Sequence, residues 1–173
     1  MHDFAELVAY VADATLTKLE EQQSRTIAEL ARGGSTIAVK GLQAIELQKA
    51  FISVGMFSVF EAAVQDALGG EFPFRSLRLL LERDGEHDLL MRFNWYAMAV
   101  NVLKHGRGKS YDQLLIEADK LPFQIKRREE AFFSEGDVAE ISILVKADGA
   151  FVLGCANVIQ EASRILRRSD FCI

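Results

Sequence analysis

One short stretch of the sequence combines a histidine, an asparagine and several cations. Its polar residues are Asn101, Lys104, His105, Arg107, Lys109 and Ser110. Histidine changes its charge near neutral pH and can act as a general acid or base. Lysine and arginine side chains bind phosphate groups. The stretch therefore predicts phosphate binding, with acid–base chemistry at the histidine.

The same stretch spans the end of one expected helix and the start of the next. We expect a helix over 86–105, ended by Gly106, and a short helix over 111–118, opened by a capping box of Ser110 and Gln113. At 100° per residue, Asn94, Asn101 and His105 share one narrow stripe of the first helix. The free N–H groups of the second helix would face the same region, as in many anion sites.

These positions assign a role to each residue. We expect His105 to be the acid or base, and Asn101 to orient either the histidine or the phosphate. The expected phosphate-binding residues are Lys104, Arg107, Lys109 and Ser110. We expect no metal ion and no organic cofactor.

A purely structural role fits the same residues. A histidine at a helix C-terminus interacts favourably with the helix dipole and the last carbonyls. Ser110 could serve only as a cap, and Asn101 could bridge two helices through buried hydrogen bonds. The glycines at 106 and 108 could serve only a tight turn. The residue pattern leaves both interpretations open.

Other charged residues give weaker signals. Arg75, Arg78 and Arg83 have acidic neighbours in the sequence, which predicts surface ion pairs. Arg92 is expected on the side of its helix opposite His105. The basic run at 126–128 is followed at once by two glutamates, which is typical of a solvated surface.

The Asn-x-x-x-His pair of Asn101 and His105, followed by glycine and a small basic loop, resembles the HEPN superfamily. The preceding long apolar helix, with the letters Phe-Ser-Val-Phe-Glu at 57–61, is similar to that family as well. The resemblance implies a helical bundle, usually dimeric. It also implies RNA cleavage without metal in many members, some of them toxins or antiviral effectors, and interaction modules in inactive members.

The family signature also contains an arginine that is separated from the histidine by four to six residues. The resemblance places it at 98, 99 or 100, where this chain has Met98, Ala99 and Val100. It implies that this arginine helps to hold the scissile phosphate, so Lys104, Arg107 or Lys109 would have to supply the charge here.

Helical periodicity continues along the whole chain. Apolar spacing, glycine stops and only two prolines predict helices over 4–31, 42–68, 74–84 and 149–168, besides the two described above. Between 120 and 147 the pattern fits either a helix or a strand, and we favour a helix. The fold expected is a single domain over 1–173, an all-α up-and-down bundle of four to five main helices.

Composition agrees with one globular domain. The chain has 173 residues, half of them apolar and 26% charged, and a net charge of −5, which disfavours a globally basic nucleic-acid binder. Two isolated cysteines and the absence of a leader pattern at the N-terminus predict a cytoplasmic protein. The longest apolar runs are too short to span a membrane, so none is expected to do so.

Two functions follow from the sequence. One is an RNA- or nucleotide-phosphate-binding protein, which as a ribonuclease would belong to a defence or toxin–antitoxin system with an antitoxin or other protein partner. The other is a non-catalytic dimerisation or interaction module with a degenerate site. In both we expect a homodimer. The segment 51–60 is apolar on nearly every side and so requires cover from the same chain or from a second subunit, and the resemblance implies a dimer.

Overall fold

The structure is a computed structural model that describes residues 4–33, 35–127, 130 and 140–169. Within these residues the chain forms six α-helices and one 3-10 turn. They are α1 (Phe4–Gly33), α2 (Thr36–Leu68), α3 (Pro73–Arg83), α4 (His87–His105), α5 (Lys109–Ile116), η1 (Ala118–Lys120) and α6 (Gly149–Arg168). The all-α class predicted from the sequence is confirmed.

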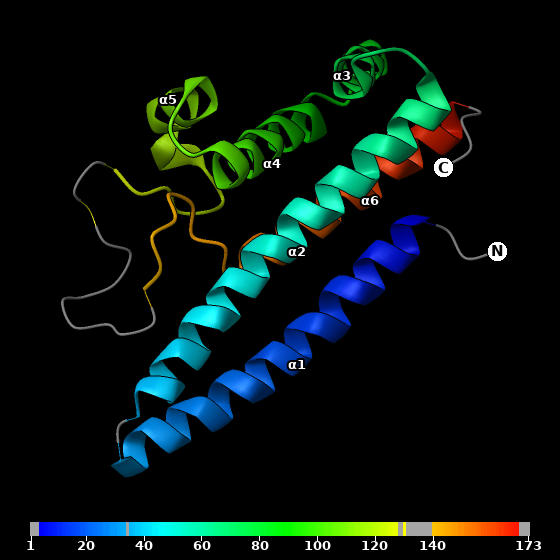
Figure 1. The fold of residues 1–173 in the computed structure, drawn as a ribbon. Coiled ribbons are helices and arrows are strands. Elements are labelled where there is room, and N and C mark those ends of the chain that lie inside the picture. The colour runs from blue at the N-terminus through cyan, green and yellow to red at the C-terminus, as the bar shows by residue number, and fades with distance from the viewer. Residues whose placement is uncertain (1–3, 34, 128–129, 131–139, 170–173) are drawn as a thin grey trace.

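The helices form a bundle in which α2 is central. Helices α1 and α2 make a long hairpin, and α6 packs against both of them (Figure 1). Helix α4 packs on α2 and α6, and it also contacts α3 and α5. Figure 1 shows α3 and α5 beyond the two ends of α4. Helix α4 therefore connects the core of the bundle to both short helices.

Most helix boundaries follow the sequence expectations, and the main difference is at the start of α2. This helix begins at Thr36, six residues before the predicted start at 42. The Ser35 hydroxyl accepts the N–H groups of Ile37 and Ala38, which caps the first turn. Glycine residues with positive φ follow α2 and α4, at Gly69 and Gly106. The spacing of the acidic residues at 3 and 6 also predicts a capping box at the start of α1, and residue 3 lies outside the described residues.

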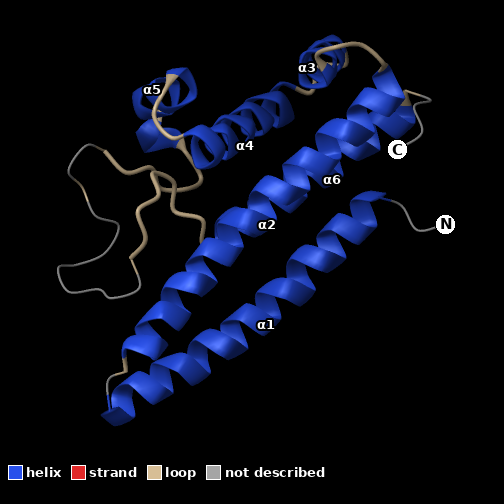
Figure 2. Ribbon diagram, viewed as in Figure 1, coloured by secondary structure: helices blue, strands red, loops and turns tan. Residues whose placement is uncertain are grey.

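The segment between α5 and α6 corrects one prediction. We favoured a helix over 120–147, but its described residues form no helix beyond the short turn that ends at Lys120 (Figure 2). Ile125 and Val145 instead form an isolated antiparallel bridge. The helix start expected at 137 lies outside the described residues. The alternation of apolar residues after 140 was thus the better guide, because one extended segment pairs with another that is distant in sequence.

A cluster of aromatic rings holds α2, α3 and α4 together. Phe93 of α4 is fully buried, and its ring centroid lies 6.0 Å from Phe57 of α2 and 5.1 Å from Phe74 of α3. Phe60 joins the cluster 6.4 Å from Phe93. Such ring pairs add stabilisation beyond the burial of their area. The cluster therefore fixes the side of α4 that faces α2.

An ion pair fixes α4 against α6. Arg92 donates two hydrogen bonds to the Glu161 carboxylate, at 2.9 and 2.8 Å, and a third to Asp88, at 2.8 Å. This two-point geometry is the strong form of an arginine–carboxylate pair. Arg92 therefore faces α6.

One side of α2 is apolar and yet exposed. Phe51 is 64% exposed and Val59 is 58% exposed. On the adjacent part of α1, Leu7 and Val11 are also exposed. Among the described helices, only α2 is long and apolar enough to cross a membrane, although core helices of water-soluble proteins meet the same criterion. Length and composition alone do not decide the matter, so the expectation that no apolar run spans a membrane stays a prediction.

Replacing Gly154 with alanine should destabilise the fold. A Cβ at this position would lie 1.9 Å from the Tyr96 hydroxyl oxygen, and the Tyr96 ring is held by Phe123 and Phe151. We expect urea titration to show a loss of about 1–3 kcal/mol in the free energy of unfolding. The control is Gly55→Ala on α2, where an added Cβ meets nothing within 4 Å. Equal stabilities of the two variants would contradict this account.

Replacing Glu161 with glutamine should lower stability at neutral pH by up to about 1 kcal/mol, because the pair with Arg92 is partly exposed. Hydrogen bonds from Arg92 hold the pKa of the Glu161 carboxyl below its ordinary value of 4.5. A lowered pKa stabilises the fold above pH 4.5, and this contribution disappears as the pH falls through the folded-state pKa. Urea titrations should therefore show the difference between wild type and Glu161→Gln shrinking from pH 7 to pH 3. A constant difference would exclude this role.

Candidate functional site

The turn between α4 and α5 places the residues singled out in the sequence. Helix α4 ends at His105 because Gly106 adopts a φ of 72°, and the Gly106 N–H still bonds to the Val102 carbonyl at 2.8 Å. Helix α5 begins at Lys109, two residues earlier than expected. Ser110 is therefore inside the helix, and its side chain makes no cap; the predicted capping box is wrong. The cap position belongs to Gly108.

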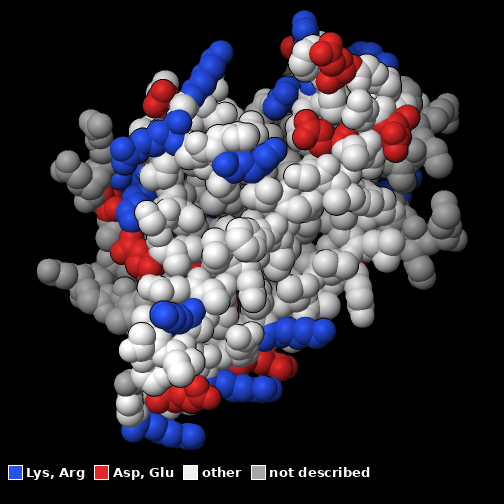
Figure 3. Space-filling view, in the orientation of Figure 1, with Lys and Arg blue, Asp and Glu red and all other residues white. Residues whose placement is uncertain are grey.

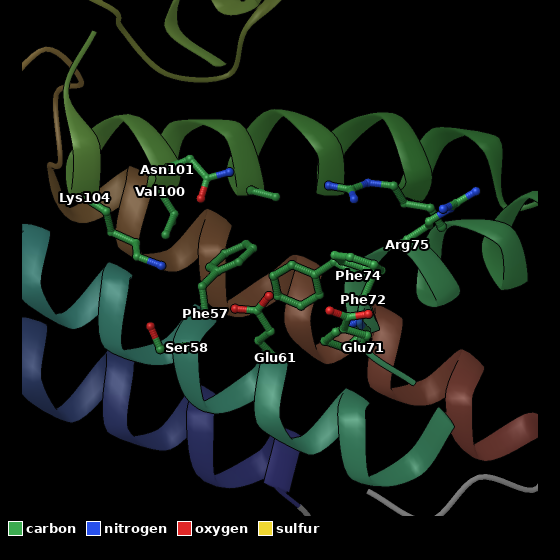
Figure 4. Close-up of a pocket in the computed structure, with 13 residues that line it drawn as sticks. Phe57, Ser58, Glu61, Glu71, Phe72, Phe74, Arg75, Val100, Asn101 and Lys104 are labelled. Carbon is green, nitrogen blue, oxygen red and sulfur yellow. The ribbon is translucent and has the colours of Figure 1, made fainter. Parts of the chain in front are cut away.

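Two grooves flank α4, and we name them by the helices that form their walls. The α2–α4 groove is also bordered by α3 (Figure 4). Its lining residues are Phe57, Ser58, Glu61, Glu71, Phe72, Pro73, Phe74, Arg75, Arg78, Ala97, Val100, Asn101 and Lys104. The α4–α5 groove is lined by Arg78, His87, Leu90, Met91, Asn94, Trp95, Met98, Asn101, Lys109, Ser110, Gln113, Ile116 and Glu117.

The predicted site residues divide between these grooves. Asn101 lines both of them, and Lys104 lines the α2–α4 groove. Figure 4 shows Lys104 extending from α4 towards α2. Lys109 and Ser110 line the α4–α5 groove. The fold therefore brings four of the six residues to the two grooves.

His105 and Arg107 line neither groove. Both are exposed at the turn after α4. The His105 side chain forms no hydrogen bond with another residue in the described part of the chain. The structural alternative for this histidine, a role in fastening α4 to the following turn, is thus not supported by a side-chain hydrogen bond within the described residues.

The loop cations are free to meet a ligand. Lys104, Arg107 and Lys109 are exposed, and none forms a salt bridge within the described ranges. Figure 3 shows Lys and Arg side chains gathered over α5 and the adjacent end of α4. A local cationic surface therefore exists on a chain whose net charge is −5.

Within the described residues, Arg78 does not form the surface ion pair with an acidic sequence neighbour that was expected for it. Its side chain lines both grooves, and its Nε donates a hydrogen bond of 2.6 Å to the Asn94 side-chain oxygen. Its guanidinium lies 5.7 Å from the centre of the Phe93 ring, a cation–π arrangement. Burial lowers the pKa of Arg78, while the charge of Glu61 acts in the opposite direction. The guanidinium remains charged at any physiological pH.

The expected surface pairing holds for only one of the α3 arginines. Arg83 does pair with Asp84 at 2.8 Å. Arg78 follows the buried Leu77 and lies one turn after Phe74, so it is at the edge of the buried face of α3. The spacing from Phe74 and Leu77 indicated a place at the edge of the core, whereas the acidic neighbours in the sequence favoured a surface ion pair.

The described cysteine offers no chemistry. Cys155 is fully buried in α6, and burial raises the pKa of its thiol. A protonated thiol is a poor nucleophile and a poor metal ligand. The residues that the structure describes also contain no cluster of three metal-binding side chains. Cys172 lies outside those residues.

Comparisons with protein-family models, with curated proteins and with solved structures found no match to this chain. Its chemistry must therefore be argued from the site. Arg78, Asn94, Asn101 and Lys104 present guanidinium, amide and ammonium groups along the walls of these two grooves. Such groups bind phosphate oxygens.

Proposed function

We propose that this chain is a HEPN-like RNA-binding protein that holds a phosphodiester where its two grooves meet. The observation that carries the proposal is Arg78, which lines the same grooves as Asn101 although it comes from a different helix. In this proposal Arg78 supplies the charge that is missing at 98–100, from a position next to Asn94, two helical turns before Asn101. Lys104 and Lys109 add positive charge on either side.

Geometry supports this role for Arg78. Its Nε bond to Asn94 and its place over Phe93 restrain the side chain, so little rotamer entropy is lost on binding. Arginine holds phosphate through several N–H groups at once. Among the described residues, two carboxylates line the α2–α4 groove together with Arg78, those of Glu61 and Glu71.

His105 would act on the bound RNA. It follows Asn101 by about one helical turn and is open to solvent. A solvent-accessible histidine can exchange protons with the RNA 2′-hydroxyl near neutral pH. We propose that the chain cleaves RNA without metal, in the cytoplasm, as part of a defence or toxin–antitoxin system with a protein antitoxin.

The first test uses a fluorescent single-stranded RNA in EDTA. Replacing His105 with alanine should reduce cleavage at least about 100-fold, because general acid–base catalysis is lost, while binding persists. Thermal unfolding should be unchanged, since His105 is exposed and has no side-chain partner in the described chain. Binding without cleavage by the wild type would contradict the ribonuclease and leave a phosphate-binding site.

The same assay tests Arg78. Arg78→Gln should weaken RNA binding about 10-fold and lower the slope of log affinity against log salt by about 1, because one phosphate contact is lost. The matched control is Arg83→Gln, on the same helix but outside both grooves. An equal effect of the two substitutions would show that only overall charge matters.

A second function, self-association, is favoured by the exposed apolar face of α1 and α2. We define this face by Leu7, Val11, Phe51 and Val59. Figure 3 shows a stretch of surface over the middle of α2 without Lys, Arg, Asp or Glu, whereas charged side chains lie along the lower half of α1. Large exposed apolar patches are typical of interfaces. We propose that a second copy of the chain covers this face.

Replacing Val59 with glutamate should therefore produce a monomer, because association would bury an unpaired charge. Light scattering after gel filtration should give a wild-type mass near twice 19.3 kDa at micromolar concentration. The control is Leu153→Glu, at an exposed leucine of α6. A wild-type protein that is monomeric would overturn the homodimer.

A further inference from the structure

The α4–α5 groove has a different chemistry from its neighbour. Its apolar lining comprises Leu90, Met91, Trp95 and Met98 of α4 and Ile116 of α5. Ile116 is 83% exposed and Met91 is 43% exposed, so these apolar atoms are open to solvent. The phosphate contacts proposed above leave this surface unused.

Polar groups border the apolar surface. The amides of Asn94, Asn101 and Gln113 offer both hydrogen-bond donors and acceptors. The amide of Asn94 is already engaged at its oxygen by Arg78, so its NH₂ group is the part left for a ligand. Two amides on α4 are seven residues apart, and hence on the same side of the helix.

The charges in this groove favour an anionic ligand. Arg78 and Lys109 contribute positive charge. Glu117 is the carboxylate among the lining residues, and it accepts a hydrogen bond of 3.2 Å from the Trp95 indole. A ligand with one flat apolar part, polar edges and an adjacent negative charge matches this combination. The groove volume of about 760 Å³ is within the range of ligand sites.

Continuity with the phosphate site selects the ligand. Arg78 and Asn101 belong to both grooves, so a group bound at Arg78 borders the apolar surface as well. A nucleotide has this arrangement, with a phosphate next to a flat base whose edges carry donors and acceptors. In a duplex the bases are stacked and paired inside, whereas in a single strand they are available.

We propose that the α4–α5 groove seats an unpaired base of single-stranded RNA beside the phosphate held at Arg78. The inference rests on the proposed RNA-binding function and specifies its substrate class. Met91 and Met98 contact the face of the base. The amides of Asn101 and Gln113 contact its edge.

The experiment compares three fluorescent ligands by anisotropy at one salt concentration. They are a single-stranded RNA, the same strand annealed to its complement, and the same strand with abasic positions. His105→Ala serves as the protein, so that no strand is cut during the titration. We expect the intact single strand to bind about 10-fold more tightly than either other ligand, because contact with one base is typically worth that much or more.

Variants locate the contact. The double substitution Met91→Ser and Met98→Ser should weaken binding of the intact strand about 10-fold and leave the abasic strand unchanged. Ile116→Ser tests the opposite wall at a side chain too exposed to affect folding, with the same expected pattern but a smaller loss. The matched control is Leu79→Ser on α3, an exposed leucine outside both grooves, which should change neither affinity.

The outcomes separate this inference from the function on which it rests. If the intact and abasic strands bind equally and in a salt-dependent way, the α4–α5 groove does not bind a base, and the proposed phosphate binding still holds. Tighter binding of the duplex would also overturn base binding in this groove. If no strand binds even at low salt, the proposed RNA-binding function is contradicted, and so is base binding in the α4–α5 groove.

Discussion

The burial of Phe93 is the constraint on which both the helix arrangement and the candidate site depend. Its ring meets aromatic rings from α2 and α3, so these two helices and α4 share one core. The guanidinium of Arg78 lies over the same ring and donates a hydrogen bond to Asn94, the residue after Phe93 in α4. The position of the arginine is therefore a consequence of core packing, and it does not depend on a bound ligand.

Helix α2 separates two surfaces of different chemistry. Ser58 and Glu61 face the α2–α4 groove, whereas Val59 and Phe51 belong to the exposed apolar face. Because residues 58 and 59 are neighbours, any molecule that covers the apolar face comes close to the edge of the groove. RNA binding and self-association are thus compatible proposals, and an occupied face would border the site without filling it.

The part of the site that could be predicted is the part encoded locally. The turn from Asn101 to Ser110 follows from an apolar helix that meets Gly106, and neighbouring cations in the sequence stay neighbours in space. Arg78 could not be found in this way. It is more than twenty residues from Asn101, and no local rule states which side of α3 will face α4.

The sequence by itself determined the helical class and the ends of α4 and α6, because apolar spacing, glycine stops and helix geometry act over a few residues. Tertiary structure alone decided the rest. It placed Arg78 between two grooves, left His105 without a side-chain partner in the described chain, and joined Ile125 to Val145 where a helix was expected. These features depend on contacts between segments that are distant in the sequence. Local periodicity can indicate a helix or an extended segment, but it does not specify which distant segment will pack against it.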